Sequence, residues 1–311
     1  MCPFTKVISV ATRSIVLLGT VLGLSAMEWA FGVDLKPPQR PKREMMFIDP
    51  DGTNLRRFHS LEDRYCGSPQ WSPDGKDIAY DAWEAGETFE DAVIEIVHVE
   101  NLTTKRLGKG AMPSWSPDGT QIVCHTYDTP STTIVVMDLD GEGREQIMDH
   151  WGSPRWSPVG NRIISANFRG GLSVFDLVSG KEWGVALGHS AWQGLSISPN
   201  GLNVCFGASD GGVVLATLNQ DATSATIRFL AETGQSYQSS WSPDSKRVVF
   251  NWRPKPEAIP QLYLYDIEQD KVPRLLPGQE STRDNREPSW SPDGKTILYV
   301  SSLAEDSELA P

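Results

Sequence analysis

Hydrophobic residues occur along this chain in short runs that are separated by turn-forming residues. In one clear stretch, a first run ends at Trp115, a second covers 121–125, a third covers 133–138 and a fourth covers 144–147. The first two runs are joined by Ser-Pro-Asp-Gly, which is typical of a type I β-turn, and the last two by Asp140-Gly141, which favours a hairpin. Runs of this length and content predict four short strands, of which the second is largely buried.

The same unit returns along the whole chain, marked by Pro-x-Trp-Ser-Pro-Asp-Gly or a worn copy of it. The third copy has lost its Asp, the fourth has lost its Trp, and the fifth has lost its Gly. The Trp position of the repeat is occupied by Trp71, Trp115, Trp156, Ile197, Trp241 and Trp290, with spacings of 44, 41, 41, 44 and 49 residues. A period of about 40–50 residues with four strands per unit is typical of a β-propeller.

The hairpin formed by the third and fourth strands also recurs, and its position predicts how the ring closes. Its copies begin near Met45, Val93, Thr133, Leu172, Gly212 and Gln261. The chain opens with a hairpin over 45–58 and ends with a Trp-type unit over 288–301, so the first hairpin can supply the outer strands that the last unit lacks. Such a closure leaves few open sheet edges. We therefore predict an all-β fold, a six-bladed β-propeller of four-stranded blades, with the last blade closed by the N-terminal hairpin.

These repeats resemble the C-terminal propeller of the TolB family, the periplasmic component of the Tol-Pal envelope system. The resemblance rests on Trp-Ser-Pro-Asp-Gly followed three residues later by Ile, as in 71–78, 115–122 and 290–297, and it covers residues 44–303. The family also carries an N-terminal α/β domain, whereas only a leader and a linker are expected here before residue 44. The resemblance implies a TolB-like propeller that binds a protein or peptide at the cell envelope, and it leaves a role in Tol-Pal open.

The first 32 residues are typical of a targeting segment. Lys6 and Arg13 form a basic head, and an apolar stretch over 15–26 ends in small residues that suit a cleavage site. We expect a signal peptide over 1–32, and hence a periplasmic or secreted protein. The alternatives are an uncleaved membrane anchor, with a tether through residues 14–33, or a true start at Met27.

Two further segments flank the expected propeller domain over 44–303. Residues 33–43 are rich in Pro and basic side chains and predict an extended linker. Residues 304–311 are expected to be a flexible tail. Because the repeats fill nearly all of the remaining chain, we predict one folded domain and a monomer.

Charge and cysteine content narrow the range of partners. The chain has a net charge of −12, and residues 1–43 hold six Lys and Arg against two acidic residues, so the remainder carries about −16. A domain this acidic is not expected to bind DNA or RNA. The domain's three cysteines, Cys66, Cys124 and Cys205, form no metal-binding or disulfide pattern and are expected to be reduced core thiols.

A binding site is expected on one face of the propeller. The connections between second and third strands and those between blades share that face, whereas the Ser-Pro-Asp-Gly turns and the hairpin turns lie on the other. The expected within-blade loops are 81–91, 125–131, 167–170, 207–211 and 251–257. The expected between-blade loops are 59–67, 150–152, 189–193, 234–238 and 279–287. These loops carry most of the His and many of the aromatic and Arg residues of the chain, which is typical of a recognition surface.

The candidate ligand-binding residues are His59, Arg64, Trp83, His125, Tyr127, His150, Trp151, Phe168, Arg169, His189, Trp192, Tyr237, Trp252, Arg253, Arg283 and Arg286. For each of these residues the alternative is packing between blades or an ordinary surface position.

The residues of the repeat itself favour a structural role. Trp71, Trp115, Trp156, Trp241 and Trp290 are expected to pack between blades. The turn residues Asp74, Asp118, Asp244 and Asp293 are expected to hydrogen-bond within their own turns. His98 takes a position held by Asp in sister repeats and is also expected to be structural.

No motif for catalysis or for nucleotide binding occurs in the chain, so we predict no catalytic residue, no metal ligand and no cofactor. The favoured hypothesis is a non-enzymatic protein- or peptide-binding propeller. The alternative is a propeller lyase, hydrolase or lactonase that acts on an acidic sugar or lactone through His and Arg on the rim, with a metal where those His converge. A third hypothesis is a scaffold without a ligand. Convergence of two or more His in one pocket would favour chemistry, and dispersal would favour binding.

Overall fold

The computed structural model describes residues 43–61, 64–127, 132–167 and 170–304. The chain divides into two units, 1–40 and 41–311, and every described residue belongs to the second. The signal peptide or anchor predicted over 1–32, the linker up to residue 42 and the tail from residue 305 therefore lie outside the described residues.

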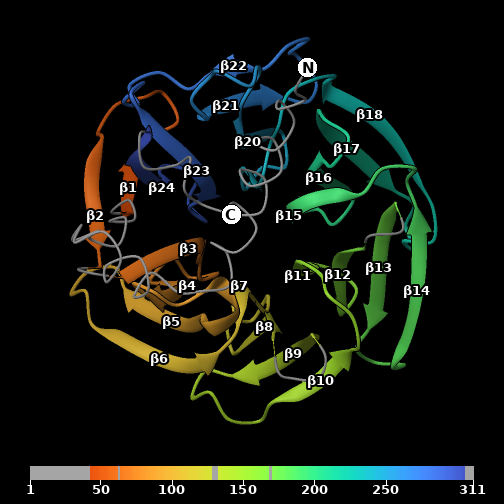
Figure 1. Cartoon of the computed structure of the whole chain (residues 1–311). Coiled ribbons are helices and arrows are strands. Elements are labelled where there is room, and N and C mark those ends of the chain that lie inside the picture. Colours follow the sequence, from red (N-terminus) through yellow and green to blue (C-terminus); the bar gives the residue numbers. More distant parts are fainter. Residues whose placement is uncertain (1–42, 62–63, 128–131, 168–169, 305–311) are drawn as a thin grey trace, which may run out of the picture. The chain divides into compact units, whose positions relative to one another are not determined.

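The described part of the chain forms six four-stranded antiparallel sheets, which surround a common axis as blades (Figure 1). In each blade one strand lies beside the axis and another lies at the periphery. Blade 1 consists of β3 (Arg64–Trp71), β4 (Asp77–Glu84), β5 (Val93–His98) and β6 (Thr104–Lys109), with a short 3-10 helix, η1 (Phe89–Asp91), between β4 and β5. Blade 2 consists of β7 (Ala111–Trp115), β8 (Gln121–Thr126), β9 (Thr133–Asp138) and β10 (Glu145–Met148).

The next three blades follow the same order. Blade 3 consists of β11 (Pro154–Trp156), β12 (Arg162–Asn167), β13 (Gly171–Asp176) and β14 (Lys181–Ala186). Blade 4 consists of β15 (Ala191–Ile197), β16 (Asn203–Ala208), β17 (Val213–Leu218) and β18 (Ala225–Ala231). Blade 5 consists of β19 (Ser239–Trp241), β20 (Arg247–Trp252), β21 (Gln261–Asp266) and β22 (Arg274–Leu275).

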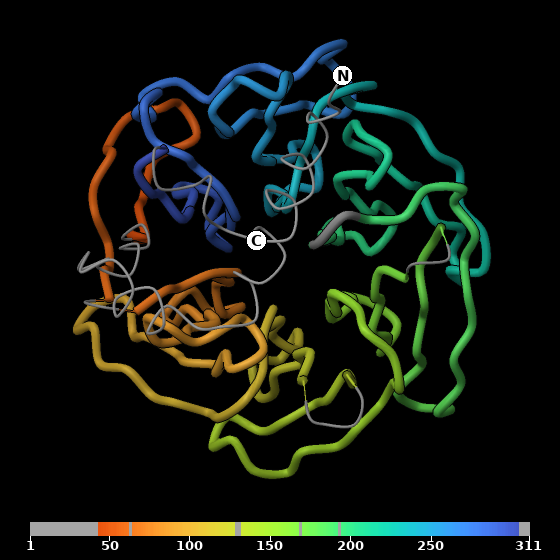
Figure 2. Tube along the Cα trace, in the orientation of Figure 1, coloured from red at the N-terminus to blue at the C-terminus, as the bar shows by residue number. Residues whose placement is uncertain are grey.

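Blade 6 is assembled from both ends of the described chain. It consists of β23 (Arg283–Trp290), β24 (Ile297–Leu303), β1 (Glu44–Ile48) and β2 (Arg56–Ser60). Strands β1 and β24 pair from Glu44↔Ser301 to Ile48↔Ile297, and Figure 2 shows the orange-red and dark blue segments of the chain side by side in this blade. The predicted six-bladed propeller, closed by the N-terminal hairpin, is confirmed.

Packing between neighbouring blades forms the core, because each sheet buries both of its faces. Ile164 and Val174 of blade 3, for example, pack against Leu195 and Phe206 of blade 4. The repeat Trp side chains lie at these boundaries. The indole nitrogen of Trp71 donates to the carbonyl oxygen of Ser289 in blade 6 at 3.2 Å. The indole nitrogen of Trp115 donates to the carbonyl oxygen of Gln70 in blade 1 at 3.1 Å.

The second strands extend further than the sequence pattern predicted. Asp81, Trp83 and Trp252 were assigned to loops, but they lie in β4 and β20. His125 was assigned both to the end of a second strand and to the start of the following loop, and it lies in β8. The difference arises because the second strand stays paired with the strands on both sides, as in Ala82↔Val93 with β5 and Trp83↔Tyr65 with β3. The prediction of loops over these positions was wrong, since polar side chains near a strand end hide the continued pairing.

The innermost strands of several blades contain a β-bulge, where one extra residue interrupts the pairing. The residue three positions before the repeat Trp lies in this bulge. In three blades this residue is Ser68, Met112 or Glu287, and each of them has a positive φ angle. A bulge changes the direction of a strand and of its side chains. These positions bring Ser68, Met112 and Glu287 into contact with residues from other blades around the axis, as described below.

The Ser-Pro-Asp-Gly turns are held by a repeated set of hydrogen bonds. In the second copy, the Ser116 hydroxyl donates to the Asp118 carboxylate at 2.6 Å and accepts from the backbone N–H of Gln121 at 2.9 Å. The hydrogen bond from Ser116 is the main cause that lowers the pKa of Asp118 from its usual value. Gly119 completes the turn with φ at +71°, a left-handed conformation that favours glycine.

Replacing Gly119 by Ala is expected to lower the free energy of unfolding by about 1–2 kcal/mol, because a side chain strains the left-handed backbone. An added Cβ at this position has Pro73 as its nearest contact, at 3.6 Å, so the effect comes from the backbone. Gly184→Ala is the matched control, because its φ is not positive and its nearest neighbour is 3.9 Å away. Chemical denaturation measures both variants, and equal losses would contradict the explanation from φ.

Candidate functional site

The candidate residues gather at one end of the strands. Because all four strands of a blade are antiparallel, the β4–β5 type of connection and the between-blade connection lie on the same face. We call this the loop face and the opposite side, with the Ser-Pro-Asp-Gly turns, the turn face. Arg64 and Arg283 begin innermost strands at the loop face, and Trp83 and Trp252 lie near or at the ends of second strands there.

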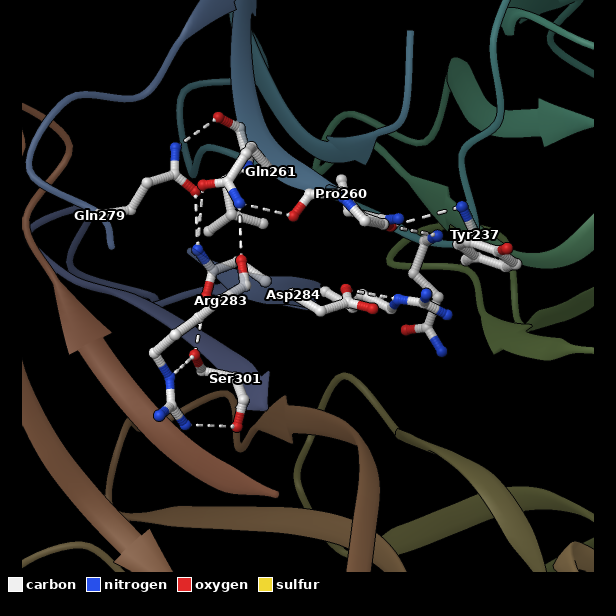
Figure 3. Close-up of polar contacts among 12 residues, drawn as sticks. Tyr237, Pro260, Gln261, Gln279, Arg283, Asp284 and Ser301 are labelled. Carbon is white, nitrogen blue, oxygen red and sulfur yellow. Dashed lines mark hydrogen bonds and ion pairs between the residues drawn. The ribbon is translucent and has the colours of Figure 1, made fainter. Parts of the chain in front are cut away.

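Arg283 is held by groups of blade 6 (Figure 3). Its guanidinium donates to the Ser301 hydroxyl at 2.8 Å and to the Glu44 carboxylate at 2.9 Å. Glu44 also pairs with Arg57 at 3.0 Å. Asn285 accepts from the Ser301 hydroxyl at 2.7 Å and joins the network to blade 5. Arg283 therefore ties together β23, β24 and β1, the strands that close the ring.

Arg286 and Tyr237 form a second polar group at the inner edge of the loop face (Figure 3). The Nε of Arg286 donates to the Asp284 carboxylate at 2.6 Å, and its guanidinium lies over the Tyr237 ring, 4.5 Å from the centroid. Burial lowers the pKa of Arg286, but the charge of Asp284 and its hydrogen bond outweigh burial, so the pKa is raised. This arginine is positioned by its neighbours and remains one-fifth exposed.

Arg64 is engaged by carboxylates of its own blade. Its guanidinium donates to both oxygens of Glu95, at 2.7 and 3.2 Å, and pairs with Glu84 at 3.0 Å. The hydrogen bond to Glu95 is the main cause that raises the pKa of Arg64. Tyr80 donates its hydroxyl to Glu95 at 2.8 Å. The positive charge of Arg64 is therefore balanced within the protein.

Six aromatic side chains form a continuous series across the loop face from blade 1 to the connection before blade 3. The series consists of Tyr65, Trp83, Phe89, Tyr127, His125 and Trp151. We call these six side chains the aromatic run. The ring centroids of consecutive members lie 4.2 to 6.0 Å apart. Three of the rings, Phe89, Tyr127 and Trp151, are only half-buried.

The four histidines of the loop face have separate partners. His150 bonds Glu182 at 3.0 Å, and His189 bonds Asp210 at 3.0 Å. His59 packs near Tyr80 and Phe58. His125 is fully buried, with neither ring nitrogen hydrogen-bonded, and burial lowers its pKa to about 4. Each imidazole therefore has its own neighbours, and they do not share one pocket.

Of the remaining candidates, two have contacts that the structure describes, and three have side chains that it does not describe. Trp252 donates its indole N–H to the carbonyl oxygen of Thr233 at 3.0 Å. The backbone of Arg253 pairs with that of Gln235, while its Nε is buried without a hydrogen-bond partner. Phe168 and Arg169 lie outside the described residues, and for Trp192 only its place in β15 is described.

The structure adds a charged group near the axis that the sequence reasoning missed. Asp81 is fully buried and accepts the backbone N–H of Met112 at 2.8 Å through one oxygen, while its other oxygen has no hydrogen-bond partner. A Cβ placed on Gly67 would lie 2.7 Å from Asp81 and 3.1 Å from Glu287, so these carboxylates are no more than about 6 Å apart. Burial, together with the charge of Glu287, raises the pKa of Asp81 to about 7.

Arg155 lies in the same electric field but forms no direct ion pair. It is 4% exposed, its Nε has no partner, and burial lowers its pKa to about 10 against the opposing effect of Asp81 and Glu287. Gln238 donates to the Ser68 hydroxyl at 3.1 Å, which links the entry of blade 5 to blade 1. Side chains from several blades thus meet at the axis below the loop face.

In the part of the chain that the structure describes, no residues are evident that would support metal or redox chemistry. No three His, Cys, Asp or Glu side chains there are placed to hold a metal ion together. Cys66, Cys124 and Cys205 are buried free thiols, and burial raises the pKa of Cys66 and Cys205 to about 12. Among the described residues, no helix has the length and hydrophobicity needed to cross a membrane.

Solved structures with the same fold are similar to this chain at low sequence identity. A putative TolB from Agrobacterium tumefaciens has a TM-score of 0.65 and 17% identity, over 85% of this chain and 99% of that one. TolB from Acinetobacter baumannii has a TM-score of 0.58 and 18% identity, over 88% and 67%. The hydrazine synthase of Kuenenia stuttgartiensis has a TM-score of 0.56 and 13% identity, over 90% and 82%. At these identities the likeness establishes the fold alone.

The family relationship comes from the sequence repeats. No curated protein sequence matches the chain. The family model of the TolB beta propeller domain matches residues 29–259, about three quarters of the chain. The repeat spacing, the six-bladed ring and this match agree, and the chain belongs to the TolB beta-propeller family.

Proposed function

We propose that this propeller is a non-enzymatic binding module, which holds a protein or peptide segment on its loop face. The aromatic run carries this proposal. Aromatic side chains supply large contact areas at little cost in conformational entropy and dominate the energetics of many interfaces. Here the run spans two blades and a connection, and its half-buried rings Phe89, Tyr127 and Trp151 offer surface to a partner.

The cellular setting belongs to the same proposal. Membership of the TolB beta-propeller family supports a place at the cell envelope, with export through a cleaved signal peptide over 1–32. A membrane anchor through residues 14–33 is the alternative. Whether the partner is a Tol-Pal component is left to the binding experiment, because the family relationship rests on the propeller.

The placement of the histidines supports binding over catalysis. A lyase or hydrolase of the propeller type needs rim His and Arg that converge on one substrate. His150 and His189 instead pair with separate carboxylates, and Arg64 and Arg283 are held in ion pairs. The guanidinium charges of Arg64 and Arg283 are therefore already balanced, and each of these imidazoles already contacts a carboxylate.

A capture experiment tests the binding function. The full chain is immobilised and exposed to an envelope extract, beside the double variant Phe89→Ala, Tyr127→Ala. We expect the variant to retain at least about tenfold less of a specific partner, since removal of interface aromatic anchors costs 1–4 kcal/mol each. Quantitative mass spectrometry of the retained proteins gives the measurement.

The matched control changes exposed apolar residues on the turn face. Val178 and Val272 are 79% and 66% exposed in hairpin turns, and the double variant Val178→Ala, Val272→Ala is expected to retain the partner fully. Circular dichroism confirms that both variants are folded. A partner lost by the turn-face variant but kept by the loop-face variant would place binding on the other side and contradict the proposal.

A further inference from the structure

We propose that the aromatic run binds guanidinium groups of an arginine-containing partner segment, and that Arg43 takes the place of such a group in the unbound protein. The inference rests on the proposed binding function and adds the chemistry of the partner.

Arg43 shows how the aromatic run accommodates a guanidinium. Its guanidinium carbon lies over the Trp83 ring, 5.6 Å from the centroid. The Cys66 thiol lies 4.0 Å from the Arg43 carbonyl oxygen, so the backbone of Arg43 is beside blade 1. A cation over an aromatic face is stabilised by the ring quadrupole, by about 0.5–2 kcal/mol according to its exposure. A partner arginine can make the same contact with the other rings.

The half-buried rings extend the surface beyond Arg43. Phe89 meets Trp83 edge to face at 5.4 Å and meets Tyr127 at 6.0 Å. Trp151 donates its indole N–H toward the Tyr127 hydroxyl at 3.5 Å. These contacts fix the rings relative to one another, so a partner does not have to order them. Pre-organisation of this kind favours affinity, because less conformational freedom is lost on binding.

The charges around the aromatic run are complementary to a basic segment. The loop between β4 and β5 carries Glu87, Glu90 and Asp91, and Glu90 is exposed. The charge of Glu90 reaches the run, since it contributes to the raised pKa of Tyr127, for which burial is the main cause. The nearest arginine of the blade, Arg64, is balanced by Glu95 and Glu84.

The buried carboxyl group of Asp81 also contributes negative charge near the aromatic run. Asp81 lies two residues before Trp83 on β4, so both side chains leave the same side of the strand. One oxygen of Asp81 has no hydrogen-bond partner, although the carboxylate is completely buried. Its charge acts on Tyr127 and Arg155, and Arg43 acts in turn on Asp81. The protein thus places a buried carboxyl group, which forms no direct ion pair, beneath the rings that already hold one arginine.

Arginine fits this surface better than lysine. The guanidinium is planar and weakly hydrated, so it stacks on aromatic rings and donates to carboxylates at the same time, whereas the lysine ammonium is compact and strongly hydrated. We therefore expect a preference for arginine within the basic residues, and no binding of an acidic segment.

The test uses three blocked hexapeptides that differ only in two positions: acetyl-Gly-Arg-Ser-Gly-Arg-Ser-amide, the same peptide with Lys, and the same peptide with Glu. Each is titrated into the full chain by calorimetry at low and high salt. We expect the Arg peptide to bind several times more tightly than the Lys peptide, and the Glu peptide not to bind. Equal affinity for Arg and Lys, or no binding of the Arg peptide, would overturn the proposal.

Two variants locate the site. Arg43→Ala is expected to increase the affinity for the Arg peptide by about 2–10-fold, because it removes the competing guanidinium. Glu90→Gln is expected to lower the affinity for the Arg peptide by about 2–5-fold at low salt. The controls are Lys105→Ala, on the outer strand of blade 1, and Glu100→Gln, on the turn face of the same blade, and both are expected to leave the affinity unchanged. No change with Arg43→Ala, or an equal change with a control, would place the peptide elsewhere.

The envelope capture separates this inference from the proposed function. If the partner is retained in a manner that depends on Phe89 and Tyr127, and the Arg peptide displaces it, the inference and the function both stand. If the partner is retained in that manner but the Arg peptide neither binds nor displaces it, the arginine chemistry is wrong and the binding function remains.

Discussion

Replacing Arg283 by Ala is expected to lower the free energy of unfolding by about 3 kcal/mol, because it leaves a buried carboxylate without its main partner. The Glu44 side chain is 9% exposed and the Arg283 side chain is 15% exposed. The same guanidinium also donates to the Ser301 hydroxyl and carbonyl oxygen. One substitution therefore removes the side-chain contacts by which Arg283 of β23 links β24 and β1, where the ring closes.

The same carboxylate provides the control, because Glu44 also pairs with Arg57 at 3.0 Å. The side chain of Arg57 is 62% exposed, and an exposed ion pair contributes about 0–1 kcal/mol. Arg57→Ala is therefore expected to be much milder than Arg283→Ala. Chemical denaturation of both variants gives the comparison. Equal losses would mean that burial does not determine the strength of this network.

The role of Arg283 in the structure differs from the role expected from the sequence. From the sequence, Arg283 is a candidate ligand-binding residue, because it falls in an expected connection on the loop face. In the structure it is the first residue of β23, and the described hydrogen bonds of its side chain all lie within blade 6. A sequence cannot distinguish these two roles, because the partner Glu44 lies 239 positions away along the chain.

The architecture was accessible from the sequence because each repeat carries its own local signals. Turn chemistry, a large apolar residue at the Trp position and the hairpin start recur along the chain, so a feature that is lost in one copy can be recognised from the others. The predicted starts at Val93, Thr133 and Gln261 coincide with β5, β9 and β21. Closure by the first hairpin followed from the order of the elements alone, and β1 pairs with β24 accordingly.

The charged group near the axis was missed, although the repeats contain a signal for it. In every blade the residue at the Trp position pairs with the residue seven positions later, as in Trp71↔Ile78 and Trp241↔Val248. The residues ten positions after it are therefore equivalent, and they are Asp81, His125, Ala166, Gly207, Asn251 and Val300. The three polar members of this set are all completely buried. Polar residues at a position that sister repeats fill with Ala, Gly or Val mark a departure from the structural pattern.

The acid–base behaviour of Asp81 follows from its burial beside Glu287. An aspartate whose pKa is raised to about 7 in the folded protein, from an ordinary value of 3.8, binds a proton more tightly when folded than when unfolded. Between these two pKa values the folded state holds more protons, so the free energy of unfolding falls as the pH rises. This contribution is complete below pH 4 and is lost by the time the pH passes 7. The turn residues Asp74 and Asp118, whose pKa values are lowered, act in the opposite direction and at more acidic pH.

Replacing Asp81 by Asn is therefore expected to flatten the dependence of stability on pH between about 4 and 7, and to raise the free energy of unfolding above pH 8 by a few kcal/mol. Asn keeps an oxygen that can accept the Met112 N–H, and it carries no charge to oppose Glu287 and burial. Denaturation at a series of pH values measures the effect, and Glu100→Gln, on the exposed turn face, is expected to keep the wild-type profile. Charged neighbours of Asp81 other than Glu287, chiefly Arg155 and Arg43, favour its ionised form. An Asp81→Asn variant that is less stable than the wild type at pH 8 would show that this attraction outweighs burial.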